Sequence, residues 1–304
     1  MTTRFNPTAL PVCLPVYATA LCTLKAELLR ARALRGTAAT IGALALAAAF
    51  SSPVATARDG VEVGGNSQFA KLVPASQVEE AASQQYQKML QEASAQQALA
   101  PANHPQVLRL RAISQKIIPH ALEWNPRAKD WKWEVNLLVS KQVNAFCMPG
   151  GKIAFYTGIL EQLKLTDDEV AMIMGHEVAH ALREHARERM GKNAATNIGA
   201  NVLGQLLGVG NTGAQVLGMG SQLLSLRFGR EDESEADLVG MELAARAGYN
   251  PRAGVSLWQK MGAASKGAPP QFLSTHPSGP KRISNIEGNL PKVLPLYELS
   301  KLKK

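Results

Sequence analysis

Cysteines, aromatic residues and long hydrophobic runs are all scarce in this sequence of 304 residues. Three cysteines are too few for a scaffold held together by disulfides. The absence of several apolar runs of about 20 residues excludes a multi-span membrane protein. The net charge of +9 is not gathered into a basic patch interleaved with aromatic residues, so we expect no nucleic-acid partner. With 46% hydrophobic and 19% charged residues, the composition is that of an ordinary folded protein and excludes a wholly disordered chain.

The first 57 residues have the pattern of a secretory signal peptide. Three arginines between residues 30 and 35 precede an uncharged, mostly small and apolar run over 37–50, and Ala55-Thr56-Ala57 follows it. A basic flank, a short apolar core and a site of small residues are the parts of such a peptide. We therefore expect export to the periplasm with cleavage after Ala57. The alternatives are an uncleaved anchor and a buried helix, although the run is short for a membrane span.

The chain after residue 57 is expected to begin with an extended lead-in over 58–76, which contains glycines and a proline. Residues 77–304 are expected to form the functional domain. Cys147 is the one cysteine in this part of the sequence, and we expect it to be a small buried apolar residue rather than a redox group.

Apolar periodicity and capping patterns predict that this domain is mainly helical. The expected helices cover residues 76–100, 104–122, 166–190, 231–247 and 251–261. Alternation within 131–143 predicts a strand, and 145–160 predicts a hairpin that turns at Pro149-Gly150-Gly151 before a further helix. The uncharged, glycine-interrupted segment 193–226 is expected to form two short helices, and 267–304 to be looped except for one short helix after Pro280. The expected fold class is therefore α+β, mainly α-helical, with a small β-sheet.

The central motif is His176-Glu177-Val178-Ala179-His180, on the helix whose start is marked by a capping box at 166–169. A spacing of four residues places both imidazoles on one helix face, where they can share a zinc ion. Glu177 points to the adjacent flank and is suited to act on a water molecule rather than to bind the metal. Two ordinary helix histidines beside a solvated glutamate are the alternative, so a third ligand is needed.

One class of zinc site takes its third ligand from the pattern His-Glu-x-x-His-x-x-Gly-x-x-His. Here Arg183 stands at the glycine position and Ala186 at the last histidine position, so this class is excluded. His185 comes one residue early. On a continuous helix it faces away from the other two histidines, and we expect it to be exposed to solvent.

Another class takes a glutamate from a later helix, and Glu233-Ser234-Glu235-Ala236-Asp237 supplies one. Glu233 and Asp237 share a helix face. Glu233 can bind the metal, while Asp237 can accept the free N–H of a metal-binding histidine and fix its tautomer. The alternative is an acidic first turn that is favoured by the helix dipole.

These motifs together resemble the HtpX and CAAX-prenyl-protease type of zinc metallopeptidase, and most nearly its soluble periplasmic branch with BepA and LoiP. The resemblance extends from about residue 105 to 287. Further matching segments are Asn144-Ala145-Phe146, Pro149-Gly150-Gly151, Thr157-Gly158, Arg230, Gly240, Ala247-Gly248-Tyr249-Asn250-Pro251, Thr275-His276-Pro277 and Arg282-Ile283.

The resemblance implies a zincin-type fold, with the small sheet beside the helix of the central motif. It implies that His176, His180 and Glu233 bind one zinc ion per chain. Glu177 is then the catalytic base, and Asp237 supports the site. The implied function is a zinc-dependent endopeptidase, whose substrates we expect to be misfolded or unassembled proteins of the cell envelope.

Three other functions compete with this one. They are a chaperone-like periplasmic protein that binds zinc with little or no proteolysis, a zinc hydrolase of another substrate class, and a structural zinc domain. An intact Glu177 disfavours the first, because a pure binder needs no base.

Strand residues 153–156 are either an exposed edge that pairs with an extended peptide or an ordinary covered strand. A peripheral contact with the membrane or with outer-membrane assembly is also left open.

His276 lies in the loop Ser274-Thr275-His276-Pro277, which the resemblance places beside the active site. One interpretation is that a neutral imidazole occupies the open zinc position in the resting enzyme. Another is that His276 donates a hydrogen bond to the oxyanion of the transition state. A solvent-exposed loop histidine is the third.

Overall fold

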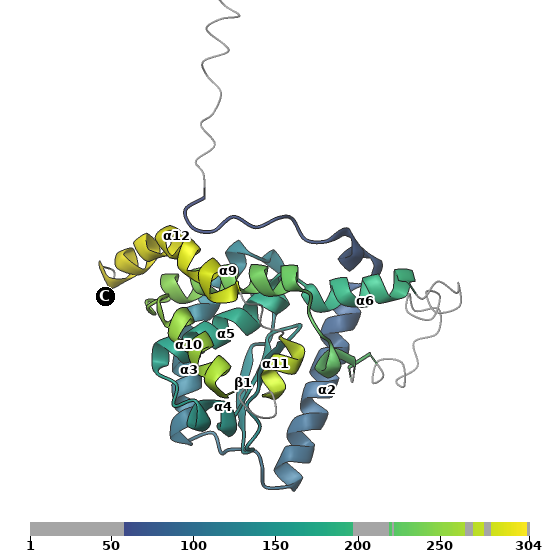
Figure 1. Ribbon diagram of the computed structural model, residues 1–304. Coiled ribbons are helices and arrows are strands. Elements are labelled where there is room, and N and C mark those ends of the chain that lie inside the picture. The colour runs from purple at the N-terminus through teal and green to yellow at the C-terminus, as the bar shows by residue number, and fades with distance from the viewer. Residues whose placement is uncertain (1–57, 197–218, 221, 265–269, 277–280, 303–304) are drawn as a thin grey trace, which may run out of the picture. The chain divides into compact units, whose positions relative to one another are not determined.

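The computed structural model describes residues 58–196, 219–220, 222–264, 270–276 and 281–302 (Figure 1). The expected signal peptide and most of the expected helices within 193–226 lie outside these residues.

The described chain is mainly helical with a small sheet, which confirms the expected α+β class. The α-helices are α2 (Ala75–Ala95), α3 (Pro105–Ile117), α4 (Thr157–Gln162), α5 (Asp167–Leu182), α6 (His185–Thr196), α9 (Arg230–Arg246), α10 (Ala253–Ala264), α11 (Gln271–Thr275) and α12 (Arg282–Leu302). The 3-10 helices are η1 (Gln68–Leu72), η2 (Ile118–Glu123) and η3 (Pro126–Asp130). The strands are β1 (Glu134–Leu138), β2 (Ala145–Met148) and β3 (Lys152–Tyr156).

Helix α5 is the centre of the fold. The predicted capping box starts it: Thr166 Oγ1 accepts the Glu169 N–H (3.3 Å), and Glu169 Oε2 accepts the Thr166 N–H (2.9 Å). All of its residues from Glu169 to Leu182 are buried, since α3, α9, α10 and β2 pack around it (Figure 1). The polar side chains of the central motif therefore lie inside the protein, where each of them needs a partner.

The sheet has the order β1-β3-β2, with β1 parallel and β2 antiparallel to β3. The predicted hairpin between β2 and β3 is present, and Gly150 and Gly151 turn it with φ of 81° and 77°. Because β3 is paired on both sides, residues 153–156 form an ordinary covered strand, and the alternative of an exposed edge is excluded. The strand order depends on the parallel pairing with β1, which no local pattern reveals.

Among the described residues, the unpaired edge of the sheet beside α5 belongs to β2 instead. Tyr156 N–H donates to Asn144 O (3.1 Å), which fixes the alternation of the antiparallel ladder. The backbone groups of Ala145 and Cys147 consequently point away from β3.

Two helical predictions need correction. The helix over 166–190 is broken after Leu182, where Glu184 takes a φ of 59° and α6 starts anew at His185. The second correction concerns 267–304, where α12 runs over 21 residues in place of a short helix in a loop. Its prolines, Pro291 and Pro295, disfavour a helix, but a buried apolar face holds it on the body. That face is formed by Ile286, Leu290, Val293 and Leu296.

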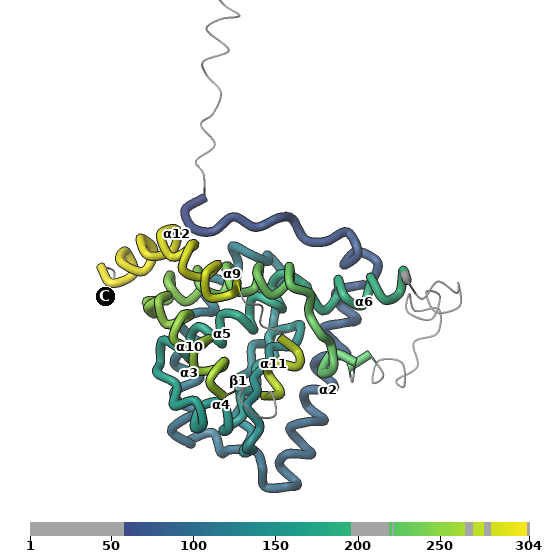
Figure 2. The backbone as a smooth tube through the Cα atoms, in the orientation of Figure 1, coloured from purple at the N-terminus to yellow at the C-terminus, as the bar shows by residue number. Residues whose placement is uncertain are grey.

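Residues 58–73 pass over α9 and reach α6 before α2 begins (Figure 2). Val61 is buried in the main core, and its N–H donates to Oε2 of the buried Glu242 on α9 (2.8 Å). Further along, η1 packs against α6, so the lead-in is not extended throughout. Within the described parts of the chain, no helix has the length and apolarity needed to cross a membrane.

Candidate metal centre and active site

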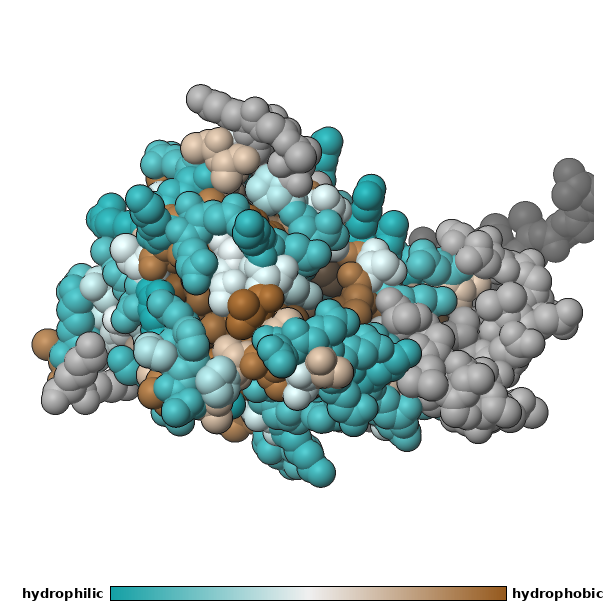
Figure 3. All heavy atoms as spheres, turned by 90° about the horizontal axis from the view of Figure 1, so that it is seen from below, coloured by the Kyte–Doolittle hydropathy of each residue, from teal (hydrophilic) through white to brown (hydrophobic). Residues whose placement is uncertain are grey.

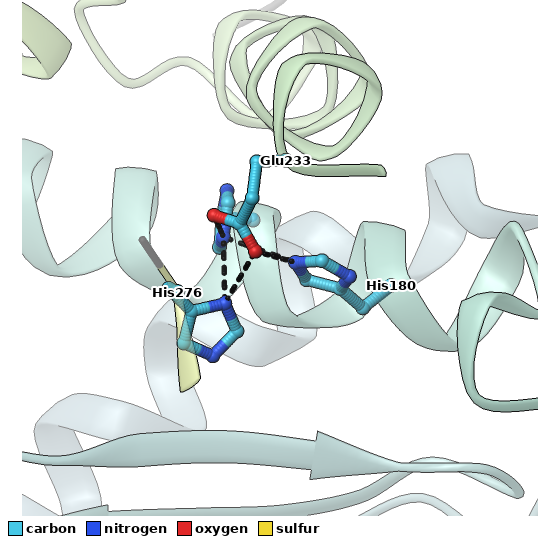
Figure 4. Close-up of side chains that lie close together, drawn as sticks. His180, Glu233 and His276 are labelled. Atoms are coloured by element: carbon cyan, nitrogen blue, oxygen red, sulfur yellow. Dashed lines mark hydrogen bonds and ion pairs between the residues drawn. The ribbon is translucent and has the colours of Figure 1, made fainter. Parts of the chain in front are cut away.

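Four buried side chains from three parts of the chain converge on one point (Figure 4). His176 and His180 come from α5 and Glu233 from the first turn of α9, while His276 directly follows α11. The Nε2 atoms of His176 and His180 lie 3.1 Å apart. Glu233 Oε1 lies 3.4 Å from His180 Nε2, and Glu233 Oε2 lies 3.6 Å from His176 Nε2.

This cluster fits a zinc ion. Ligands at about 2.0–2.1 Å in a tetrahedral site are separated from one another by about 3.3 Å, which matches the observed spacing. The ligand atoms of the four side chains all lie within 4.8 Å of one another. Two imidazole nitrogens and a carboxylate are also a donor set that catalytic zinc takes.

The protonation states suit metal binding as well. Burial lowers the pKa of His180 well below its ordinary value, so its imidazole is neutral and keeps a free lone pair. Burial raises the pKa of Glu233, but the imidazoles of His180, His276 and His176 beside it outweigh this effect and the net pKa is lowered. Glu233 is therefore an ionised carboxylate.

Asp237 lies where the sequence predicts it. Its Oδ1 is 3.0 Å from His176 Nδ1 and can accept the N–H of that ring, which leaves Nε2 free for the metal.

Arg282 joins these two acidic groups, a role that the sequence analysis did not assign to it. Its Nη1 donates to Glu233 Oε2 (2.8 Å) and its Nη2 to Asp237 Oδ1 (2.7 Å). The guanidinium carbon lies 3.5 Å above the ring of Trp258. The one sequence signal for Arg282 was its place among the matching family segments.

Glu177 lies beside this cluster without joining it. Its Oε1 is buried and has no hydrogen-bond partner among the described residues, although His276 Nε2 is 3.5 Å away. Burial raises the pKa of Glu177. A buried carboxylate with an unsatisfied oxygen and a raised pKa is suited to accept a proton.

His276 is buried and only 3% exposed, so it is not a solvent-exposed loop residue. Its Nδ1 lies 3.0 Å from Glu233 Oε1 and 3.4 Å from His176 Nε2. Burial lowers the pKa of His276, but the carboxylates of Glu177 and Glu233 outweigh it and the net pKa is raised.

His185 contradicts its expected exposure. It is 2% exposed, and its Nδ1 lies 2.9 Å from Nδ1 of His180. The prediction assumed a continuous helix, whereas the break at Glu184 turns His185 back towards the site.

A cleft of about 310 Å³ opens beside this centre. Glu177, His180 and His276 lie on one part of its wall, and the edge strand β2 forms another. The remaining wall is mixed: it carries apolar side chains, among them Leu223, Leu226 and Phe228, beside polar ones such as Gln142 and Gln271. Cys147 also lines it and is buried, as expected, and burial raises the pKa of its thiol.

Known proteins share this part of the chain. The model of "Peptidase family M48" matches residues 106–290. Mitochondrial metalloendopeptidase OMA1 of Arabidopsis thaliana is 43% identical over 152 residues, 49% of this chain and 30% of that protein. OMA1 of Schizosaccharomyces pombe is 34% identical over 197 residues, 64% of this chain and 56% of that one. Metalloprotease LoiP of Escherichia coli K12 is 27% identical over 203 residues, 66% of this chain and 77% of LoiP.

The expected family resemblance is thereby confirmed, with LoiP among the relatives. The sequence analysis did not anticipate the similarity to OMA1. The chain spans 30% and 56% of the lengths of the two OMA1 proteins.

Proposed function

The chain belongs to peptidase family M48, and we propose that it is a zinc-dependent endopeptidase that cleaves misfolded or unassembled cell-envelope proteins. The observation that carries this proposal is the buried set of His176, His180 and Glu233 with the unsatisfied carboxylate of Glu177 beside it. Glu177 and His180 line a cleft of about 310 Å³, and ligand atoms of His176 and Glu233 lie 3.1 and 3.4 Å from His180 Nε2.

Each residue of the site has a part in the proposed hydrolysis. His176, His180 and Glu233 would hold a zinc ion, which would supply Lewis acidity for a carbonyl and lower the pKa of a water molecule to about 7. Glu177 takes a proton from the attacking water and passes it to the leaving amine. Asp237 orients His176, and Arg282 holds Glu233 and Asp237 in place.

We propose that the substrate binds along β2. An extended peptide can pair with the outward backbone groups of Ala145 and Cys147. Asn144 Oδ1 accepts the Ala145 N–H (3.0 Å) and protects this donor until a peptide replaces it. Pairing through backbone groups depends little on the side chains of the substrate. The apolar residues of the cleft wall, such as Leu223 and Phe228, suit the apolar segments that unfolded proteins expose. Hydrophobic surface gathers around a hollow on the face of the molecule that Figure 3 shows.

The alternative is a chaperone-like protein that binds zinc and unfolded chains without cutting them. The buried Glu177 disfavours it, because leaving a carboxylate oxygen buried and unsatisfied costs stability and serves binding in no way.

Export with cleavage after Ala57 is part of this proposal. The signal-peptide pattern of residues 30–57 supports it. N-terminal sequencing of periplasmic protein is expected to start at Arg58. A start upstream of residue 41 would mean that the segment is retained.

A zinc assay paired with cleavage of casein tests the function. The native protein is expected to hold one zinc per chain and to cut casein. The variants His176→Ala, His180→Ala and Glu233→Ala are expected to lose the metal and the cleavage. Glu177→Gln is expected to keep the metal and lose cleavage, and cleavage by this variant at a near-native rate would contradict the mechanism.

A further inference from the structure

The ring of His180 has a second buried imidazole directly behind it. His180 Nε2 faces the metal cluster, while its Nδ1 lies 2.9 Å from Nδ1 of His185. Both rings are buried, with exposures of 3% and 2%. Two ring nitrogens at this distance form a hydrogen bond only if one donates and the other accepts.

The direction of this hydrogen bond follows from the metal site. A neutral His180 that offers the lone pair of Nε2 to a metal carries its proton on Nδ1. Nδ1 of His185 must then accept, which places the proton of His185 on Nε2. That atom faces Glu235, whose Oε2 is 3.6 Å away, within ion-pair range but too far for a hydrogen bond. Nε2 of His185 is buried and has no hydrogen-bond partner among the described residues, so Glu235 is the acceptor that faces it.

Glu235 is itself held in place. Its Oε1 pairs with Nε of Arg183, and Nη2 of Arg183 donates to Gly64 O in the lead-in. The contact with Arg183 orients the Glu235 carboxylate, whose other oxygen faces His185.

One face of the His180 ring is covered by an aromatic side chain. Phe228 stacks on the ring with centroids 4.0 Å apart and an interplanar angle of 24°. The stacking limits the tilt of the ring and forms no hydrogen bond with Nδ1. His185 is thus the group that satisfies the second nitrogen of His180.

We propose that His185 and Glu235 are positioning residues, which fix the tautomer and orientation of His180 for zinc through a carboxylate–imidazole–imidazole chain. The inference rests on the proposed zinc site. Asp237 contacts the ring of His176 directly, whereas Glu235 would act on His180 through the imidazole of His185, which lies between them. A partner that accepts the second N–H of a metal-binding imidazole makes that imidazole more basic, and the loss of such a partner typically costs 10–100-fold in metal affinity.

Packing alone offers a different explanation, in which His185 merely fills a buried space. The two explanations differ in what the zinc-free protein shows. Filling space contributes to the stability of the fold and not to the affinity of the folded protein for zinc. Positioning acts on zinc affinity even when the fold is unchanged.

The test measures zinc affinity by competition with a chromophoric chelator, and the thermal midpoint of the zinc-free protein separately. His185→Asn places an amide oxygen near the position of Nδ1, where it can still accept from His180. His185→Gln places its amide near the position of Nε2, where it can reach Glu235 but not His180. His185→Phe keeps the size of the ring without an acceptor.

We expect zinc affinity to fall 10–100-fold in His185→Gln and His185→Phe, and by less in His185→Asn. Glu235→Gln is expected to weaken zinc binding by less than His185→Phe does, because a neutral acceptor still orients His185. His104→Phe is the matched control: it removes a ring nitrogen that accepts the Gln106 N–H at the start of α3, away from the metal. It is expected to lower the thermal midpoint and leave zinc affinity unchanged.

Equal zinc affinity in folded His185→Asn, His185→Gln and native protein would overturn the inference, as would tighter binding by the Gln variant than by the Asn variant. A native protein that binds no zinc would instead contradict the proposed function.

Discussion

Gly175 and Gly240 meet backbone to backbone where α5 crosses α9. A Cβ atom added to Gly175 would lie 2.5 Å from the carbonyl oxygen of Gly240, and one added to Gly240 would lie 2.6 Å from the amide nitrogen of His176. The two helices carry all of the expected zinc ligands, so this contact sets the distance between His176 and Glu233. The glycines are required here by close approach and not by an unusual backbone angle.

Gly240→Ala is expected to push the two helices apart. Overpacking of this kind costs about 1–3 kcal/mol of unfolding free energy, and we expect weaker zinc binding in addition because Glu233 moves away from His176. Gly262→Ala is the control, since Gly262 lies in α10 with no atom within 4 Å of an added Cβ. There alanine is expected to leave stability unchanged or to raise it by up to about 1 kcal/mol through helix propensity. Chemical denaturation of both variants measures the difference, and equal stability would contradict the role of the crossing.

Arg282 is expected to be essential for stability before any metal binds. Its guanidinium faces Glu233 and Asp237, which are both buried, and Arg282→Ala leaves two like charges together. Breaking a buried ion pair by removing one partner costs about 3–5 kcal/mol. Arg282→Lys keeps the charge but loses the forked hydrogen bonding and the stacking on Trp258, so we expect a partial loss. Chemical unfolding of the zinc-free proteins measures their stability, which is expected to decrease from native protein to Arg282→Lys to Arg282→Ala. Equal stability of all three would show that the two carboxylates need no cation.

Glu169 gives a pH dependence that does not involve the metal site. Its carboxylate accepts from Lys260 Nζ (2.6 Å) and Ser256 Oγ (2.8 Å) as well as from the cap of α5. Burial raises the pKa of Glu169, but these hydrogen bonds outweigh it and the net pKa is lowered. A folded pKa below the unfolded value means that the unfolded chain binds more protons. The stabilisation is therefore complete above about pH 4.5 and is lost as the pH falls through the folded pKa.

Glu169→Gln is expected to lower the unfolding free energy by about 1–3 kcal/mol at pH 7. Glutamine can still accept the Thr166 N–H that caps the helix, but it cannot form an ion pair with Lys260. The deficit relative to native protein is expected to shrink as the pH drops below about 4.5. Glu161→Gln, at an exposed position, is the control and should change stability little at either pH. A deficit that is the same at pH 7 and at pH 3 would contradict the assigned ion pair.

The sequence predicts those parts of the fold that depend on local signals. Thr166 and Glu169 mark the start of α5, the spacing of His176 and His180 places both rings on one face, and Gly150 and Gly151 mark the hairpin. Each of these patterns acts over a few residues. The pairing of Asp237 with His176 was also predictable, because it needs only the two helices and the usual orientation of a metal-binding histidine.

The parts that sequence reasoning missed depend on contacts between distant residues. The break at Glu184 requires a left-handed backbone that no neighbouring glycine announces, and it decides whether His185 is exposed or buried. Arg282 meets Glu233 across 49 residues of sequence. Helix α12 continues through Pro291 because its apolar face is buried on the body, a contribution that helix propensity does not include.

His276 occupies a position that favours the role of a resting plug over that of a transition-state donor. Its Nδ1 is among the ligand atoms, at 3.0 Å from Glu233 Oε1, whereas its Nε2 reaches Glu177 at 3.5 Å. We therefore expect His276→Ala to cut unfolded protein faster than the native enzyme and to bind zinc somewhat more weakly. If His276 instead donates to the oxyanion, its loss should slow cleavage by about 10²-fold or more at unchanged zinc affinity.

Two measurements separate these outcomes: cleavage of casein under saturating zinc, and zinc affinity by chelator competition. Phe272→Leu is a useful second variant, because Phe272 stacks on His276 with centroids 4.6 Å apart and contributes no ligand atom. A plug that is held by packing is expected to loosen in this variant, which raises cleavage less than His276→Ala does. Cleavage and zinc affinity that are both unchanged in His276→Ala would exclude the plug and the transition-state donor together.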